Sequence, residues 1–319
     1  VALITGSQVI SDQSACGAIR LACPTLEHRL EVEHETALCA GEPYGEQLAC
    51  PITGSGFLVA PRVVATAADI AQMLDCDDMY LVFGFATPAG RLPETDTYHG
   101  PEDRLTHEGD PFEERYDEMR AFDIRDPDEM VRRCKEVLFH PEWDDEAVSG
   151  WAANDVALIL LDRPVEDRQP LPLAGEAPAT GREMIMLGHP KGMPAQVETG
   201  EVVDIPLPVD FSLGRRVYDA DELGGAFFVD LMAYAGHGGA PLIDAEGAVA
   251  GLLIDGGHDW LIEQGDTARP GRVHEGREGC LRWNRCERLG EPGCPGSLAG
   301  STAVVADLLE RSGWTSDEN

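Results

Sequence analysis

Two acidic residues and one histidine lie where short apolar segments begin or end, and such side chains can perform acid–base chemistry. Asp69 closes the segment 54–69, a predicted hairpin of two apolar strands that ends in small residues. Asp155 directly precedes a predicted buried strand, and His237 lies within the glycine-dense turn of 234–241. Carboxylates and an imidazole can transfer protons or bind a cation, so we expect the functional site to be formed by these segments.

The elements that must position these residues are predicted to be β-strands. Short β-branched and aliphatic runs are separated by Gly, Pro and Asp, and no helical pattern of twelve or more residues alternates with them. This pattern favours an all-β sandwich or barrel over a parallel α/β sheet. One helix is predicted over 301–311, where apolar residues share one face and hydroxyls at 301 and 302 can cap its start. The predicted strands are 57–60, 62–66, 80–85, 156–161, 184–187, 202–205, 227–231 and the pair 242–244 with 248–254.

The three segments resemble those of trypsin-like serine peptidases of the chymotrypsin fold, in their order and spacing. The resemblance runs from Cys39 to Ala306, and the stretch 187–194 is similar to a glycine- and proline-rich turn of bacterial members. It implies two six-stranded antiparallel β-barrels with a C-terminal helix. The matching segments are Gly54-Ser-Gly-Phe-Leu-Val-Ala-Pro-Arg-Val-Val-Ala-Thr-Ala-Ala-Asp69, Asn154-Asp-Val-Ala-Leu-Ile-Leu-Leu-Asp-Arg-Pro164 and Tyr234-Ala-Gly-His-Gly-Gly-Ala-Pro241.

The chain is expected to divide into an N-terminal barrel, 1–165, and a C-terminal barrel, 166–319. The proline-punctuated stretch 163–178 is the predicted connector between them. Residues 94–133 contain 14 acids and 6 bases with few aliphatic residues, so we expect a solvated excursion there. A short helix near 111–120 is the one element predicted within it.

The chemistry of the family requires three side chains, and the resemblance implies that this chain has one of them. A serine hydroxyl attacks the substrate, a histidine accepts its proton, and an aspartate orients the histidine. Asp69 stands at the histidine position, Gly238 at the serine position, and Asp155 matches the orienting aspartate. Losing the nucleophile or the base costs on the order of a millionfold in turnover. We therefore expect a pseudoprotease without a cofactor, which acts as a binding or regulatory module.

Other positions of the cleft follow from the same resemblance. The N–H groups of Gly236 and Gly238 match the oxyanion hole, which can still bind a carbonyl or carboxylate oxygen. Met232 matches the base of the specificity pocket, which would then prefer an apolar or small group. His237 matches a side chain that turns away from the cleft, which indicates a structural role. Ile70 stands where the family often has a cysteine, so the associated disulfide should be absent.

Two other functions remain open on these residues. Asp69 and Asp155 should approach each other in this fold, with His237 nearby, and a bound ion or an unusual acid–base set would make the chain a hydrolase. A hard cation such as calcium takes six or more oxygen ligands, and only two acids can be named, which disfavours a metal site. The third hypothesis is a secreted structural protein whose acidic surface is its functional part.

Nine cysteines suit an oxidising compartment, so we expect a secreted or periplasmic protein. No export-signal pattern opens the sequence, and any such signal has been removed or lies outside it. Cys76 and Cys134 flank the acidic excursion and are predicted to form a disulfide at its base. Disulfides are also favoured over a zinc site for Cys280, Cys286 and Cys294, whose spacing fits zinc motifs poorly.

The balance of charge limits the partners. The chain has 24 Lys and Arg against 58 Asp and Glu, a net charge of −34. Nucleic acids and anionic membranes require clustered cations, so neither is expected as a partner. A basic or neutral protein or peptide is expected instead, although a salty habitat would also account for the acidity. No apolar run reaches eighteen residues, so no membrane span is predicted.

Overall fold

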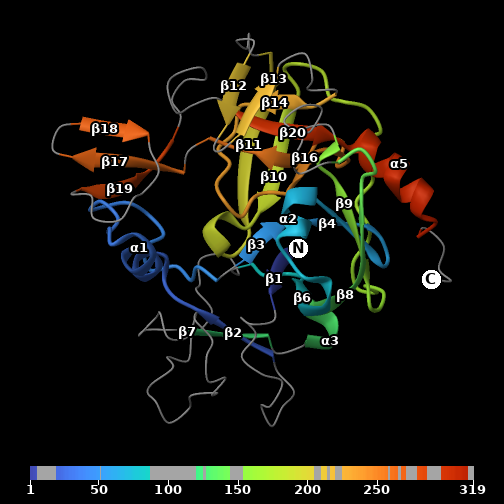
Figure 1. Ribbon diagram of the computed structural model, residues 1–319, viewed down its shortest axis with the longest axis horizontal. Coiled ribbons are helices and arrows are strands. Elements are labelled where there is room, and N and C mark those ends of the chain that lie inside the picture. Colours follow the sequence, from blue (N-terminus) through green and yellow to red (C-terminus); the bar gives the residue numbers. More distant parts are fainter. Residues whose placement is uncertain are drawn as a thin grey trace.

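The computed structural model contains two antiparallel β-barrels and a C-terminal helix that packs against both, as the sequence predicts (Figure 1). None of the helices in its described part is long and apolar enough to cross a membrane. The structure describes residues 1–5, 19–50, 52–86, 120–124, 127–143, 154–204, 210–213, 216–219, 225–257, 259–264, 267–270, 279–285 and 296–314.

The first barrel is a seven-stranded sheet in the order β3-β1-β6-β8-β9-β5-β4. Its end strands, β3 and β4, are separated by Gly56 alone, so the chain itself completes the ring. An added Cβ at Gly56 would lie 2.9 Å from the carbonyl oxygen of Ala65, which explains why glycine occupies this bend. Counted as one bent strand, β3 and β4 give the expected six strands. The bounds are β1 (Ala2–Thr5), β3 (Ile52–Ser55), β4 (Phe57–Ala60), β5 (Val63–Thr66), β6 (Met79–Val82), β8 (Val131–Phe139) and β9 (Ala157–Leu161).

The second barrel is closed, in the order β10-β11-β14-β20-β16-β15. Side chains of β10 alternate between exposed and buried, as expected for a strand with one face toward a core. The bounds are β10 (Glu183–Gly188), β11 (Gln196–Val203), β14 (Phe227–Val229), β15 (Pro241–Ile243), β16 (Val249–Asp255) and β20 (Ser297–Ser301).

Helix α5 (Thr302–Ser312) packs against the first barrel's core and against strand β16 of the second barrel. The Ser301 hydroxyl caps its start by accepting from the N–H of Ala303 at 3.3 Å, as predicted. The buried side chains of Val305 and Leu308 belong to one apolar cluster with residues of both barrels, such as Ile159 and Leu252.

The connector between the barrels hydrogen-bonds to both. The N–H of Leu171 donates to Leu58 of the first barrel, and the N–H of Val249 in the second barrel donates to Pro172. Backbone bonds of this kind hold the part of the connector from 165 to 174 against the two barrels.

Smaller elements surround the barrels. Helix α1 shares a buried apolar cluster with a three-stranded sheet in the order β18-β17-β19, and the sequence predicted neither. Two strand pairs, β2 with β7 and β12 with β13, complete the described sheets. The bounds are β2 (Ile19–Cys23), α1 (Leu26–His34), α2 (Ala68–Gln72), η2 (Cys76–Asp78), β7 (Arg120–Ile124), α3 (Pro127–Met130), η4 (Pro190–Gly192), β12 (Asp210–Leu213), β13 (Arg216–Asp219), β17 (Trp260–Gln264), β18 (Thr267–Pro270) and β19 (Cys280–Trp283).

The prediction of a solvated excursion over 94–133 is wrong for its last part. Strand β7 and helix α3 lie within 120–130, and Ile124 and Val131 are buried in an apolar cluster of the first barrel. The burial of these two residues was not predicted, because the stretch around them is rich in acidic residues and poor in apolar ones. Residues 94–119, and with them all but the last residue of the predicted helix 111–120, lie outside the described residues.

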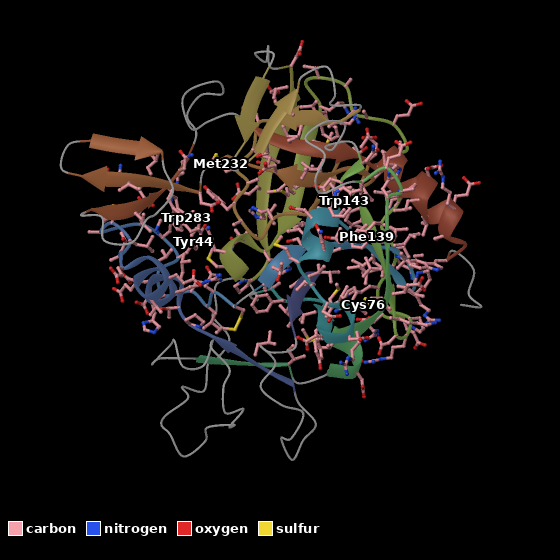
Figure 2. All side chains as sticks on the ribbon, in the orientation of Figure 1. Tyr44, Cys76, Phe139, Trp143, Met232 and Trp283 are labelled. Carbon is pink, nitrogen blue, oxygen red and sulfur yellow. A yellow bond between two sulfur atoms is a disulfide. The ribbon has the colours of Figure 1, made fainter. Side chains whose placement is uncertain are left out.

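Three disulfides lie within the described residues. Cys76–Cys134 is confirmed, and Figure 2 shows Cys76 beside the first barrel. Cys23–Cys50 and Cys39–Cys280 were not paired in the sequence analysis. The bond to Cys39 removes Cys280 from any zinc site, as the preference for disulfides predicted, and the other two cysteines of that trio lie outside the described residues.

Candidate functional site

Asp69 and Asp155 lie side by side at the start of helix α2. Asp69 is the second residue of this helix, and its backbone N–H donates to Oδ1 of Asp155 at 3.0 Å. Asp155 is fully buried. Ala67 at the cap position has no side-chain oxygen, so the Asp155 carboxylate performs the capping that a serine or threonine provides in other helices. The Asp155 carboxylate, just before β9, is therefore held against the backbone of Asp69.

The glycine-dense turn lies against the first barrel through its backbone. Gly236 and Gly239 have φ of +98° and +79°, in the left-handed region that favours glycine. An added Cβ at Gly239 would overlap the carbonyl oxygen of Ser55 and the hydroxyl of Thr66, and one at Gly236 would overlap the carbonyl oxygen of His189. Both glycines are thus required by conformation and by space.

Ser55 connects this turn to two other segments, and sequence reasoning did not identify it. Its backbone N–H donates to the carbonyl of Gly238 at 2.8 Å, and its hydroxyl donates to the carbonyl of Gly236 at 2.8 Å. The same hydroxyl accepts from the N–H of His189 at 3.0 Å. Ser55 is 1% exposed, so these bonds form in a low-dielectric environment and fix the turn firmly. The only sign of its role in the sequence was its position between two glycines, Gly54 and Gly56, at the end of a strand.

Ile70 fills the space in front of Gly238. An added Cβ at Gly238 would lie 2.9 Å from Cδ1 and 3.0 Å from Cγ1 of Ile70, and an added Cβ at Gly54 would overlap Cγ2. Ile70 is 6% exposed and belongs to the core of the first barrel. Gly238 itself does not have a positive φ, so its backbone would accept a side chain, and Ile70 would have to shift to make room for one.

His237 is held within the turn and away from solvent. Its Nδ1 accepts from the N–H of Tyr234 at 3.0 Å, which places the proton of the neutral ring on Nε2. Burial lowers the pKa of His237 to about 3, so the ring is neutral at physiological pH. None of its hydrogen bonds within the described residues goes to Asp69 or Asp155. This geometry accords with the structural role that the resemblance implies.

His189 is a second buried histidine close to the turn. Its Nδ1 lies 3.2 Å from the carbonyl oxygen of Met193, and its ring stacks on Phe85 at a centroid distance of 5.6 Å. Burial lowers the pKa of His189 to about 3. His140 also lies beside a proline, and its Nδ1 accepts from the N–H of Glu142 at 3.3 Å. Both rings are hydrogen-bonded in strand-end turns.

The N–H groups of Gly236 and Gly238 donate no hydrogen bond to any residue of the described chain. The neighbouring N–H groups are hydrogen-bonded within the chain: that of His237 donates to the carbonyl of Tyr234, and that of Gly239 donates to the carbonyl of Leu253. Two backbone donors at the predicted oxyanion-hole positions thus stay available to an acceptor such as a carbonyl or carboxylate oxygen.

The region beside Met232 is tightly packed. An added Cβ at Gly256, just after β16, would lie 2.7 Å from the carbonyl oxygen and 2.9 Å from the Cβ of Ala233. The backbone that follows β16 therefore lies directly against the residue after Met232, and no side chain fits between them. Figure 2 shows Met232 on the same side of the molecule as Tyr44 and Trp283.

An aromatic cluster supports the turn from the side of the β17–β19 sheet. The rings of Tyr234 and Trp283 meet edge to face at 4.7 Å, and Trp260 lies 4.3 Å from Trp283. Asp259 accepts from the N–H of Ala235 at 2.9 Å and forms an ion pair with Lys191. Burial raises the pKa of the Tyr234 hydroxyl well above its usual value, so this hydroxyl is a donor at all ordinary pH.

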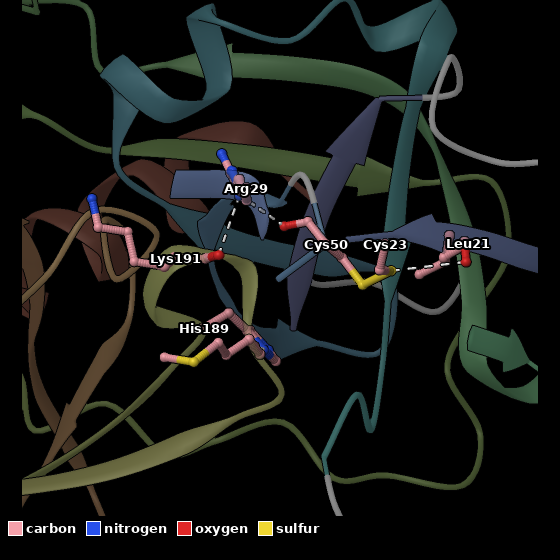
Figure 3. The surroundings of a disulfide bond; sticks show 7 residues. Leu21, Cys23, Arg29, Cys50, His189 and Lys191 are labelled. Carbon is pink, nitrogen blue, oxygen red and sulfur yellow. Dashed lines mark hydrogen bonds between the residues drawn. A yellow bond between two sulfur atoms is a disulfide. The ribbon is translucent and has the colours of Figure 1, made fainter. Parts of the chain in front are cut away.

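A small cavity of about 120 Å³ lies between helix α1 and the glycine turn. Arg29 of α1 lines it, and Nη1 of this residue donates to the carbonyl oxygens of Cys50 at 3.3 Å and Lys191 at 3.2 Å (Figure 3). Arg29 is also paired with Glu33 at 3.0 Å. The rest of the wall is mixed: Leu26, Leu30, Ile52, Ala235 and Gly236 are apolar, whereas Glu33, Thr53 and Lys191 are polar or charged.

The described residues do not assemble a metal centre from Asp69, Asp155 and His237. In this part of the chain, only Cys39, Glu263 and Cys280 bring three potential ligand atoms within 4.8 Å of one another. The two cysteines are joined in a disulfide, so that group has no free thiolate to offer a metal. The hypothesis of a metal-assisted hydrolase needs a third ligand beside Asp69 and Asp155, and the described residues do not provide one within this distance.

The chain is similar to known proteins. The family model of the trypsin-like peptidase domain matches residues 54–252. An inactive form of an alanine mutant of Rv3671c from M. tuberculosis H37Rv is 16% identical, with a TM-score of 0.37, and the alignment covers 83% of this chain and 84% of that one. Mouse neuropsin, a serine protease expressed in the limbic system of the brain, is 11% identical, with a TM-score of 0.42, and the alignment covers 82% and 89%. No curated protein sequence matches.

Proposed function

Because this chain belongs to the trypsin-like peptidase domain family, we propose that it is a non-proteolytic member that serves as a binding or regulatory module. The resemblance puts the base of such enzymes at Asp69 and the nucleophile at Gly238. A carboxylate that is ionised near neutral pH accepts a proton far less readily than an imidazole, and glycine has no hydroxyl to attack with.

The observation that carries the proposal is the position of Ile70. Its side chain occupies the space that any side chain at position 238 would need, with a closest distance of 2.9 Å to an added Cβ. Interiors are close-packed, so a serine could enter only if Ile70 moved. The cleft is therefore packed around a glycine, and the missing serine is part of this packing.

The retained parts of the cleft support binding. Asp155 is buried and hydrogen-bonded to the backbone of residue 69, and the N–H groups of Gly236 and Gly238 make no bond within the described chain. Such donors bind an oxygen without cleaving the molecule that carries it. We propose a basic or neutral protein or peptide as the partner, in keeping with the net charge of −34.

We also propose a secreted or periplasmic location. Three disulfides lie within the described residues, and such bonds persist in oxidising compartments. Two of them, Cys23–Cys50 and Cys39–Cys280, anchor the segments that flank helix α1.

A direct test measures hydrolysis by the unmodified chain, using casein and acetyl esters as substrates, with and without divalent ions. We expect no turnover above background. Turnover that purifies with the chain, and that is lost in a Gly238→Ala or Asp69→Asn variant, would contradict the proposal.

A restored variant sharpens the test. Asp69→His with Gly238→Ser returns the missing groups, and adding Ile70→Ala removes the side chain that obstructs position 238. We expect labelling by a fluorophosphonate probe in the triple variant, less in the double variant, and none in a triple variant that also carries Asp155→Ala. The contact between Gly256 and Ala233 predicts that only small acyl groups will be accepted.

A further inference from the structure

The outer face of the β10–β11 hairpin is exposed and has an apolar end and an acidic end. Three cross-strand pairs lie on it: Leu187 opposite Val197, Ile185 opposite Thr199, and Glu183 opposite Glu201. All six side chains are exposed, whereas Met184 and Met186, which alternate with them, are buried in the barrel core. The face therefore changes from apolar to acidic along its length, over roughly 13 Å from the first pair to the last.

The apolar end of this face is unusual for the molecule. Five large apolar side chains in the described residues are exposed, and three of them are Ile185, Leu187 and Val197, at 41%, 39% and 61% exposure. They are neighbours on one sheet face, while the other two, Tyr44 and Met73, lie outside this hairpin, in a loop and directly after α2. Contiguous exposed apolar side chains with a polar rim are typical of interaction sites.

Within the described residues, no cation is paired with the acidic end of the face. Glu183 and Glu201 are directly opposite each other, and neither forms an ion pair within the described chain. Arg182, the adjacent cation, is paired with Glu246 at 2.5 Å instead. Like charges in opposed positions destabilise a sheet, and a cation placed between them would remove that cost.

We propose that this face, the β10–β11 outer face, binds a protein segment that presents apolar side chains followed by a lysine or arginine. The apolar side chains cover Ile185, Leu187 and Val197, and the cation lies between Glu183 and Glu201. A second copy of this face does not fit, because it presents no lysine or arginine to the glutamate pair and each copy carries a net charge of −34. The face lies on the outside of the second barrel and does not depend on the catalytic state of the cleft.

The test uses a phage library that displays random twelve-residue peptides. Peptides are selected on the unmodified chain after depletion on a variant with Ile185→Thr, Leu187→Thr and Val197→Thr. Threonine is β-branched and suits a strand, so the variant should keep the hairpin while losing its apolar face. We expect the enriched peptides to contain apolar residues with a nearby lysine or arginine. Fluorescence anisotropy should then show at least a tenfold loss of affinity for the triple variant.

A charge variant and a matched control complete the design. Glu183→Gln with Glu201→Gln should weaken binding at low salt several-fold and reduce its salt dependence. Met73→Thr removes an equally exposed apolar side chain elsewhere and should leave the affinity unchanged. Circular dichroism confirms that each variant is folded.

Three outcomes would overturn the inference. The first is that no peptide distinguishes the unmodified chain from the triple variant. The second is that the enriched peptides lack cations or bind the glutamine variant equally well. The third is a dimer in sedimentation equilibrium that the triple variant abolishes, because the face would then bind a second copy. None of these results depends on the hydrolysis assays that test the proposed function.

Discussion

The glycine turn at 236–239 and the surface turn at 244–247 contain glycines of similar conformation for different reasons. Gly239 has a φ of +79° and Gly247 a φ of +85°. Nothing lies within 4 Å of an added Cβ at Gly247, whereas one at Gly239 would overlap Ser55 and Thr66. The surface turn requires only a residue that tolerates the left-handed region, but the buried turn also requires the absence of a side chain. Gly238 belongs to neither class, because its φ is ordinary and only the Ile70 side chain excludes a substituent.

The largest effect that we expect separates Gly239 from Gly247. Gly239→Ala combines the cost of a left-handed alanine with a collision against backbone atoms, and it should cost about 4 kcal/mol or prevent folding. Gly247→Ala has only the conformational cost and should lose about 1 to 2 kcal/mol. Urea unfolding of both variants measures the difference, and equal losses would refute the distinction between the two turns.

A smaller effect is expected at Gly238. Gly238→Ala should cost about 1 to 3 kcal/mol because the added methyl meets Ile70. The same substitution should cost less in an Ile70→Ala background, and a double-mutant cycle of unfolding free energies reports this coupling. A cost that is independent of residue 70 would show that something other than the Ile70 side chain excludes a substituent.

The buried ring of the turn should make stability depend on pH. The pKa of His237 is lowered to about 3, against about 6.5 in an unfolded chain. Between these values the unfolded state binds more protons, so stability falls as pH drops, by about 1.4 kcal/mol per unit for this residue. His237→Asn, whose amide oxygen can accept from the N–H of Tyr234, should remove this contribution. Urea titrations from pH 7.0 to 4.5 test it, and parallel profiles for the two proteins would contradict it.

The sequence predicted the barrels better than the site. The predicted strands 57–60 and 156–161, observed as Phe57–Ala60 and Ala157–Leu161, are continuous apolar runs between turn residues, and such runs can be recognised within one segment. The pairing of Cys76 with Cys134 was predicted because the two flank one excursion, and the structure confirms the bond. Helix α1 was missed because it is only nine residues long and weakly amphipathic. Its local signal was Thr25, whose hydroxyl accepts from the N–H of His28 at 3.2 Å.

The contacts that decide the chemistry could not be found in the sequence. That Asp69, Asp155 and Gly238 belong to one cleft followed from a family resemblance. The side chain of Ile70 in front of Gly238, the three bonds of Ser55, and the contact of Gly256 with Ala233 depend on how closely separate segments approach. No pattern within a single segment encodes such distances, because they arise only when the two barrels pack together.

The Cys39–Cys280 bond has a consequence for handling the protein. It joins residues 241 positions apart and so encloses most of the chain, including every strand of the two barrels except β1 and β20. A single cut by a contaminating protease anywhere inside this loop would leave the two fragments covalently attached. Such nicked material would migrate as one band on a denaturing gel until a reductant is added, when it would separate into two.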